Sequence, residues 1–226
     1  MNVGILGTGM VGRAIAARLV ELGHSVMIGT RDPASTLART ETDRMGNVPF
    51  GDWLKQNAGV RLGAFAEAAA HGEIVVNATS GSASLAALEA AGAENLSGKI
   101  IVDIANPLEA SQGMPPMLSV SNTDSLGEQI QRAFPESKVV KTLNTVNASV
   151  MAYPQRLANG DHTVFVSGND ADAKATVSEL LRSFGWQDII DLGDITSARA
   201  AEMYLPLWLR LFGTFGTPFV SIRVVR

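Results

Sequence analysis

The sequence contains no cysteine among its 226 residues. This absence excludes disulfides, thiolate metal sites, thiol nucleophiles and dithiol redox relays. It also agrees with a cytoplasmic location, because structural disulfides belong mainly to oxidising compartments. Any chemistry must therefore come from other side chains or from a bound cofactor.

Charged and aromatic residues are also scarce. Charged residues make up 18% of the chain and aromatic residues 6%, and the net charge is −4. Without a basic surface, the composition gives no electrostatic sign of nucleic-acid binding. The apolar content of 46% is enough to fill a substantial core. We therefore expect a folded globular protein with no nucleic-acid partner.

Long uninterrupted hydrophobic runs are missing as well. The most apolar segment, from Met203 to Val225, is interrupted by prolines, glycines and arginines. We interpret it as buried protein rather than a membrane span. We also expect no signal peptide, because the first residues have the pattern of a strand and not of a basic leader.

A glycine motif stands at the beginning of the sequence. An apolar strand at residues 3–6 precedes Gly7, Gly9 and Gly12, and apolar residues at helical spacing follow. Gly7 permits a tight turn, Gly9 lets a phosphate approach the backbone, and Gly12 lets the helix pack closely. The free N–H groups of the first helical turn then face the phosphates. This strand, turn and helix predict a dinucleotide-binding unit.

The residues after the second predicted strand, His24 to Ile28, indicate which dinucleotide binds. An NAD enzyme usually carries an acid about 20 residues beyond the glycine motif. Here Thr30 and Arg31 stand at that place, and a guanidinium can pair with a phosphate through two hydrogen bonds. Asp32 competes as a ribose ligand, although Asp32-Pro33 is typical of a helix N-cap followed by proline. We predict NADP rather than NAD.

Strands and helices alternate along the chain as far as Leu192. This pattern predicts a Rossmann-type α/β fold, with a doubly wound, mostly parallel sheet that helices cover on both faces. We assign 1–192 to a dinucleotide-binding Rossmann domain and 193–226 to a C-terminal helical segment. The other strands are expected at Val60–Leu62, Glu73–Asn77, Lys99–Ile104, Lys138–Lys141, Thr163–Val166 and Asp188–Leu192.

Boundaries of three helices can also be predicted. Ser125 and Glu128 match a capping box, and Asn169 is expected to cap a helix that ends at Gly185. The final helix is expected from Ser197 to Leu211, with a kink at Pro206.

One long segment has no regular pattern. The residues from Leu108 to Thr123 predict an irregular loop that contains Met114 and Met117. Long loops in compact domains are often functional, and methionines can line an adaptable apolar surface. A plain surface crossover is the alternative interpretation.

Several motifs together resemble the deazaflavin-dependent NADP oxidoreductases, a group that includes the similar reductase domain of six-transmembrane metalloreductases. The resemblance extends over essentially the whole chain. It implies hydride transfer between NADP(H) and a flat acceptor, either a deazaflavin such as coenzyme F420 or a flavin. It also implies a homodimer whose C-terminal segment helps to build the acceptor pocket. The motifs are the glycine motif, Gly-Thr-Arg at 29–31, Lys-Thr-Leu-Asn-Thr at 141–145, Val-Ser-Gly-Asn-Asp at 166–170 and the tail from Ser197 onward.

The resemblance also implies the residues of the site. Beside the three glycines of the motif, those expected around NADP(H) are Thr8, Met10 and Val11 at the pyrophosphate, Thr30 and Arg31 at the 2′-phosphate, Thr79, Ser80, Asn106 and Pro107 at the border, and Asn144, Thr145 and Val146 near the nicotinamide. Those expected near the acceptor are Met117, Pro206, Leu207 and Leu211. Ser35 stands where the family often has a further basic residue, and a serine there can still bind phosphate.

No pair of side chains suggests acid–base catalysis, and hydride transfer between two cofactors requires none. We therefore name no catalytic residue and no metal ligand. The histidines His24, His71 and His162 are interpreted as surface or capping residues, and Trp186 and Trp208 as core or interface residues. Two alternatives stay open. One is a reductase of another small acceptor, such as a quinone or a ferric chelate, and the other is a non-catalytic NADP-binding regulatory protein.

Overall fold

The protein's structure, a computed structural model, describes residues 1–43, 46–111 and 113–226. At its centre lies an eight-stranded sheet. Its strands are β1 (Asn2–Leu6), β2 (Ser25–Thr30), β3 (Val60–Ala64), β4 (Ile74–Asn77), β5 (Ile100–Asp103), β8 (Lys138–Thr142), β9 (Thr163–Ser167) and β10 (Asp188–Asp191).

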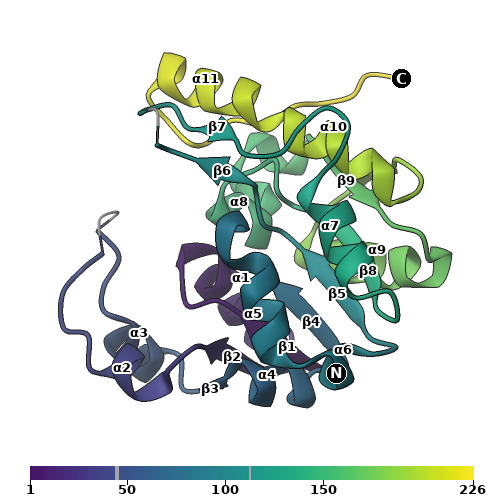
Figure 1. Ribbon diagram of the computed structural model, residues 1–226. Coiled ribbons are helices and arrows are strands. Elements are labelled where there is room, and N and C mark those ends of the chain that lie inside the picture. Colours follow the sequence, from purple (N-terminus) through teal and green to yellow (C-terminus); the bar gives the residue numbers. More distant parts are fainter. Residues whose placement is uncertain (44–45, 112) are drawn as a thin grey trace.

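The strands follow the order β10-β9-β8-β5-β4-β1-β2-β3 (Figure 1). The chain runs outward from β1 to β3 on one side and then from β4 to β10 on the other. All neighbouring strands are parallel except β8 and β9, which are antiparallel. The order in which the chain adds strands reverses between β1 and β4, although the two strands are parallel. Sheets of this kind bind ligands at that point, outside the carboxyl ends of the strands.

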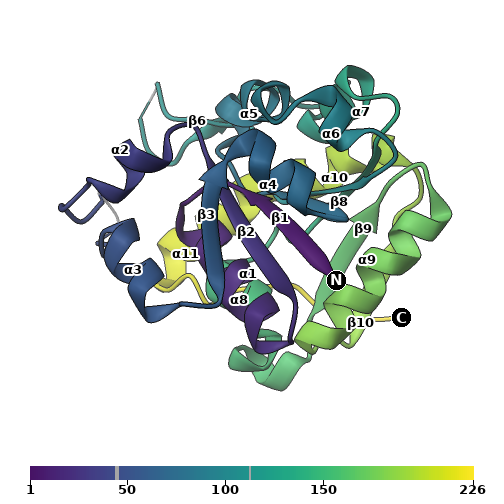
Figure 2. The ribbon, with the colours of Figure 1, turned by 90° about the horizontal axis from the view of Figure 1, so that it is seen from below.

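Helices cover both faces of the sheet (Figure 2). One face carries α1 (Met10–Glu21), α8 (Ala148–Ala152) and α9 (Ala171–Phe184), and the other carries α4 (Phe65–His71), α5 (Ser84–Ala91), α6 (Ala93–Leu96) and α7 (Leu126–Ala133). Within β4, Ile74 and Val76 contribute to the first core and Val75 to the second. This alternation explains why the strands are apolar throughout, and it confirms the predicted doubly wound fold.

The C-terminal segment contains a short turn of 3₁₀ helix, η4 (Ile195–Ser197), followed by α10 (Ala198–Met203) and α11 (Leu205–Phe215). The predicted single helix is thus divided at Tyr204, with Pro206 in the first turn of α11, so the predicted kink is confirmed. The tail then returns to the sheet, where the Thr163 amide donates to the Ile222 carbonyl at 2.9 Å. Within the described part of the chain, no helix is both long and apolar enough to cross a bilayer.

Four expectations need correction. Asn169 is not the cap of α9, because Asp170 accepts the cap hydrogen bond from the Ala173 amide at 2.8 Å. The final helix does not end at Leu211, because α11 continues as far as Phe215. The segment 108–123 is not wholly irregular, because β6 (Leu108–Glu109) and β7 (Met117–Leu118) pair in antiparallel fashion. Gln112, within that segment, lies outside the described residues.

The fourth correction concerns His162, which is not a surface or capping residue. It is only 3% exposed and packs edge-on against Trp186, with ring centroids 4.7 Å apart. Trp186 itself is 2% exposed, which confirms its place in the core. The remaining helical elements are α2 (Pro33–Leu37), α3 (Phe50–Gln56), η1 (Gly81–Ala83), η2 (Pro154–Arg156) and η3 (Ala158–Gly160).

Candidate functional site

The glycine turn after β1 has the geometry that its spacing predicts. Gly7 adopts a φ of +118°, and a Cβ there would lie 2.6 Å from the Ala78 carbonyl oxygen. A Cβ on Gly12 would overlap the Gly7 carbonyl, so α1 packs too closely against the turn for any side chain. A Cβ on Gly9 would meet nothing within 4 Å. The turn is therefore closed against the sheet and open at Gly9, the N-cap of α1.

A cleft of about 650 Å³ lies on this open side. Its walls come from the carboxyl ends of β1, β2 and β4, where the strand order reverses. The structure thus brings together residues from three predicted parts of the site. The residues that line the cleft are Gly7, Thr8, Gly9, Thr30, Arg31, Asp32, Ser35, Thr36, Arg39, Phe65, Ala78, Thr79 and Ser80.

Asp32 stands at the end of the cleft beside β2 and acts as the N-cap of α2. Its carboxylate accepts from the Ser35 amide at 3.0 Å and from the Ser35 hydroxyl at 2.6 Å. These two hydrogen bonds lower the pKa of Asp32. The predicted N-cap is confirmed, and both carboxylate oxygens are occupied within the turn. Thr30 is engaged in a similar way, since its hydroxyl lies 2.9 Å from that of Thr36.

Two arginines lie at this end of the cleft, and the sequence motifs indicate only Arg31. Arg39 follows α2 and lines the same cleft. Arg39 stands outside every sequence motif, so no local pattern indicates that its side chain reaches the cleft.

A third arginine, Arg13, is fixed behind the glycine turn. Its Nε donates to the Thr8 carbonyl at 2.9 Å, and its Nη1 donates to the Val48 carbonyl at 2.6 Å. Its guanidinium also stacks over the Phe50 ring, 5.3 Å from the centroid. Burial lowers the pKa of Arg13, and the negative charge of Asp43 opposes this shift only in part. Arg13 therefore connects the glycine turn to the segment before α3.

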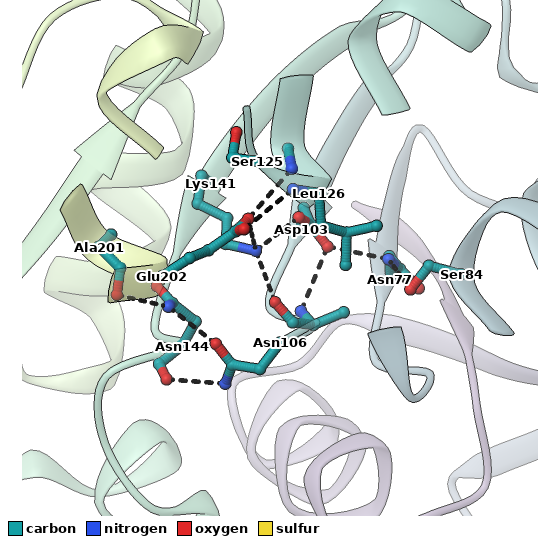
Figure 3. A network of polar contacts seen from close by, with 12 residues as sticks. Asn77, Ser84, Asp103, Asn106, Ser125, Leu126, Lys141, Asn144, Ala201 and Glu202 are labelled. Atoms are coloured by element: carbon teal, nitrogen blue, oxygen red, sulfur yellow. Dashed lines mark hydrogen bonds and ion pairs between the residues drawn. The ribbon is translucent and has the colours of Figure 1, made fainter. Parts of the chain in front are cut away.

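A buried polar cluster lies at the carboxyl ends of β4, β5 and β8 (Figure 3). The Lys141 ammonium group donates to Asp103 at 2.8 Å, to Glu202 at 2.8 Å and to the Ala105 carbonyl at 2.5 Å. The side chains of Lys141 and Asp103 are fully buried, and that of Glu202 is 1% exposed. Burial lowers the pKa of Lys141, but the two carboxylates outweigh it, so the net shift is upward.

The two carboxylates of this cluster have further donors. Glu202 accepts from the Leu126 amide at 2.9 Å and from the Gly127 amide at 3.1 Å, at the beginning of α7. Asp103 accepts from Asn77 at 2.8 Å. Sequence reasoning missed this cluster. Its signal was one or two charged residues within each of three short, mainly apolar segments, Ile-Ile-Val-Asp, Lys-Val-Val-Lys-Thr and Ala-Arg-Ala-Ala-Glu-Met.

Asn106 and Asn144 form a pair next to the cluster. Asn106 donates to the Asn144 carbonyl at 2.9 Å, and the Asn144 amide group donates to Asn106 at 3.0 Å and to the Ala201 carbonyl at 3.0 Å. Asn144 is 2% exposed, so its side chain holds the two segments together. The predicted residues that do not line the cleft are Met10, Val11, Gly12, Asn106, Pro107, Asn144, Thr145 and Val146.

A second cavity, a groove of about 470 Å³, lies between the β6–β7 segment and α11. It brings together Met117 and Pro206, both predicted near the acceptor. Leu207 and Leu211 do not line it, and Leu207 is 54% exposed. The lining residues are Pro115, Pro116, Met117, Leu118, Ser121, Pro206, Leu209 and Arg210.

Comparison with known proteins agrees with this arrangement. A family model described as NADP oxidoreductase, coenzyme F420-dependent, matches residues 2–107. The crystal structure of an Arthrobacter sp. FB24 protein assigned as an F420-dependent NADP-reductase is 62% identical and superposes with a TM-score of 0.96, covering 100% of both chains. An F420-dependent NADP reductase of Methanocaldococcus jannaschii is 29% identical over 99% of this chain and 98% of that protein.

One relative is much longer than this chain. Metalloreductase STEAP3 of Rattus norvegicus is 32% identical over 213 residues, which cover 92% of this chain. The matched part is 38% of that protein, so this chain spans well under half of its length.

Proposed function

Since this chain belongs to the family of coenzyme F420-dependent NADP oxidoreductases, and is therefore an NADP-dependent oxidoreductase, we propose that it transfers a hydride between NADP(H) and a deazaflavin or flavin-like acceptor. The observation that carries this proposal is the cleft at the switch of the sheet. It is open over Gly9, where a pyrophosphate needs access, and it has arginines at the end where a 2′-phosphate would lie.

The NADP(H) contacts are proposed as follows. The pyrophosphate would lie over Thr8 and Gly9, where the first N–H groups of α1 and the helix dipole favour an anion. Arg31 would bind the 2′-phosphate, because Asp32 and Ser35 already satisfy each other. Thr79 and Ser80 would border the cofactor from the end of β4. The Asn106–Asn144 pair would hold in place the part of the protein that is expected near the nicotinamide.

The acceptor is proposed to bind in the groove between Met117 and Pro206. The two cofactors supply the hydride chemistry when bound. The chain's own residues then orient the two molecules and keep water away, which requires no proton donor. Asn144, which is expected near the nicotinamide, is held in place by three hydrogen bonds and suits this task.

Replacement of Arg31 tests the cofactor assignment. A charge-assisted hydrogen bond contributes roughly 1.5–3 kcal/mol, which corresponds to about ten- to a hundredfold in affinity. Arg31→Ala should therefore weaken NADPH binding by that factor and leave NADH binding nearly unchanged, because NADH has no 2′-phosphate. Titration of both cofactors against both proteins measures this difference. Equal weakening of both, or a wild-type preference for NADH, would restore Asp32 as a candidate ribose ligand.

The acceptor is tested by following NADPH oxidation with one acceptor at a time. We expect turnover with F420 or a flavin. Turnover with ferric chelates alone would favour the second candidate, a metal reductase, which the similarity to Metalloreductase STEAP3 supports. Met117→Asp should raise KM for the acceptor and leave KM for NADPH unchanged, if the groove is the acceptor site. An unchanged acceptor KM would place the acceptor elsewhere.

We further propose a homodimer formed through the outer face of α11. Leu207 and Phe215 on α11 are 54% and 64% exposed, and Phe219 in the segment after it is 41% exposed, an unusual apolar surface for a monomer. Removal of the whole segment after Asp194 would also remove Glu202 from the buried cluster, so point substitutions are the cleaner test. Leu207→Asp together with Phe215→Asp should give a monomer in light scattering. A dimer that persists in this variant would refute the proposed interface.

A further inference from the structure

The two arginines at the basic end of the cleft lie on either side of one short helix. Arg31 precedes α2 and Arg39 follows it, yet both line the same cleft. Both residues are exposed. The chain therefore folds around α2 so that two cations eight positions apart in the sequence border one ligand-sized space.

The other polar groups at this end of the cleft already have partners. Ser35 donates both its amide and its hydroxyl to Asp32, and the Thr30 hydroxyl is paired with that of Thr36. In contrast, neither arginine has a hydrogen bond or ion pair with any residue that the structure describes. The guanidinium groups thus carry the free donors of this region. Free, rigid guanidinium donors match the oxygens of a phosphate group.

The charge of the cleft points to the same kind of ligand. Its lining residues include two cations, Arg31 and Arg39, and one carboxylate, Asp32. The local balance is therefore positive on a chain whose net charge is −4. A phosphate monoester carries close to two negative charges at neutral pH, and a single arginine would leave part of this charge unbalanced.

We propose that Arg39 is a second cationic ligand of the 2′-phosphate of NADP(H) and acts together with Arg31. This inference rests on the proposed NADP(H) site and adds a residue that sets the preference for NADP over NAD. The arrangement would compensate for Ser35, which is uncharged and directed toward Asp32. Two guanidinium groups would hold the phosphate from both ends of α2.

The pyrophosphate is the competing partner for Arg39. Arg39 also lines a smaller cavity of about 140 Å³ together with Thr8 and Gly9 of the glycine turn. An arginine that binds the pyrophosphate would affect NADH and NADPH alike, since both contain it. An arginine that binds the 2′-phosphate affects NADPH alone. The two partners therefore predict different results for one substitution.

The experiment measures the dissociation constants of NADPH, NADH and 2′,5′-ADP for the wild type and for Arg39→Ala. We expect NADPH and 2′,5′-ADP to bind about tenfold more weakly to the variant, as the loss of one charge-assisted contact predicts. NADH should change by less than about twofold. Arg39→Lys should restore part of the affinity, because it restores the charge without the planar fork. In the double variant with Arg31→Ala, NADPH should bind no better than NADH.

Arg182→Ala is the matched control, because Arg182 is an exposed arginine on α9 that pairs with Glu179. It should change none of the three constants. Unfolding midpoints of Arg39→Ala and the wild type should nearly coincide, since Arg39 is exposed and has no hydrogen bond or ion pair within the described part of the chain. Equal weakening of NADH and NADPH would overturn the proposal in favour of the pyrophosphate, and no weakening at all would overturn it outright.

Failure of the cofactor assignment itself gives a separate result. A wild-type protein that prefers NADH would refute both the proposed cofactor and the role of Arg39. A wild-type protein that prefers NADPH by a margin that Arg39→Ala leaves unchanged would refute only the role of Arg39.

Discussion

The buried cluster around Lys141 and the basic end of the cleft use charge in opposite ways. Lys141, Asp103 and Glu202 are almost completely removed from water, and each donor or acceptor has a partner. Arg31 and Arg39 are exposed and have no partner among the residues whose structure is known. In the buried cluster the charged groups are paired with one another. At the basic end of the cleft the two guanidinium groups are available to bind a ligand.

The difference indicates a difference in role. A buried charge tolerates the loss of water only when protein groups replace all of its hydrogen bonds. Such a cluster can fix the ends of β5, β8 and α10 relative to one another. Its hydrogen-bonding groups are already used within the protein and are not available to a ligand. An exposed arginine stabilises the fold little, and its donors are free to bind an anion. Substitutions in the first region should change stability, and those in the second should change affinity.

The largest expected effect is the loss of Lys141. Lys141→Met leaves two buried carboxylates without their cation, and breaking a buried ion pair in this way costs about 3–5 kcal/mol. Urea unfolding of the variant and the wild type measures the loss in the free energy of unfolding. The control is Lys55→Met, since Lys55 pairs with Asp52 on the surface. It should change stability by less than about 1 kcal/mol.

Equal losses for Lys141→Met and Lys55→Met would break the comparison between buried and exposed charges. Failure of Lys141→Met to fold agrees with the expected direction, and Lys141→Arg then provides a measurable variant. It keeps the charge but not the size, so it should fold with a smaller loss.

The second effect is the loss of the charge on Glu202. The Leu126 and Gly127 amides bond to different oxygens of the carboxylate, so Glu202→Gln keeps an acceptor for only one of them, and it removes one negative charge beside Lys141. The cluster then retains one cation and one anion, so the loss should be about 1.5–3 kcal/mol, smaller than for Lys141→Met. A larger loss would mean that Glu202 contributes mainly as the charged cap of α7. Urea unfolding of both variants compares the two losses.

The third effect concerns Arg13, which is paired although it lies beside the cleft. Arg13→Met keeps the apolar contact with Phe50 but removes the hydrogen bonds to the Thr8 and Val48 carbonyls. The glycine turn then loses its support, and NADPH and NADH should both weaken by about tenfold or less, the equivalent of one ordinary hydrogen bond. Titration of both cofactors checks this. Selective weakening of NADPH would show that Arg13 acts on the 2′-phosphate instead.

The features that the sequence predicts correctly depend on residues close together in the chain. The glycine turn, the Asp32 cap, the Ser125 capping box and the kink near Pro206 all follow from contacts within a few residues. The sheet follows from the alternation of elements, because parallel strands need helical crossovers.

The features that the sequence does not reveal depend on contacts between distant segments. Asp103, Lys141 and Glu202 meet only because β5 and β8 are neighbours and α10 crosses their ends. Asn169 and Asp170 are both good caps. Asn169 is excluded because its side chain accepts from the Ile195 amide at 3.1 Å, across 26 residues. Arg39 likewise reaches the cleft through the course of the chain after α2, which no local pattern encodes.

The smallest effect sharpens the comparison, because Asp124 and Arg132 are paired but partly exposed. Hydrogen bonds from Arg132 are the main cause that lowers the pKa of Asp124 from 3.8 to about 2. The lowered pKa means that the stabilisation is complete above the unfolded value of 3.8 and is lost as the pH falls through about 2. Because Arg132 is 60% exposed, we expect Asp124→Asn to lose less than about 1 kcal/mol at pH 7. This difference should disappear near pH 2, where Asp124 becomes protonated in the wild type. Thermal unfolding of both proteins at several pH values measures it. A loss as large as that of Lys141→Met would mean that exposure does not separate the two kinds of charge in this protein.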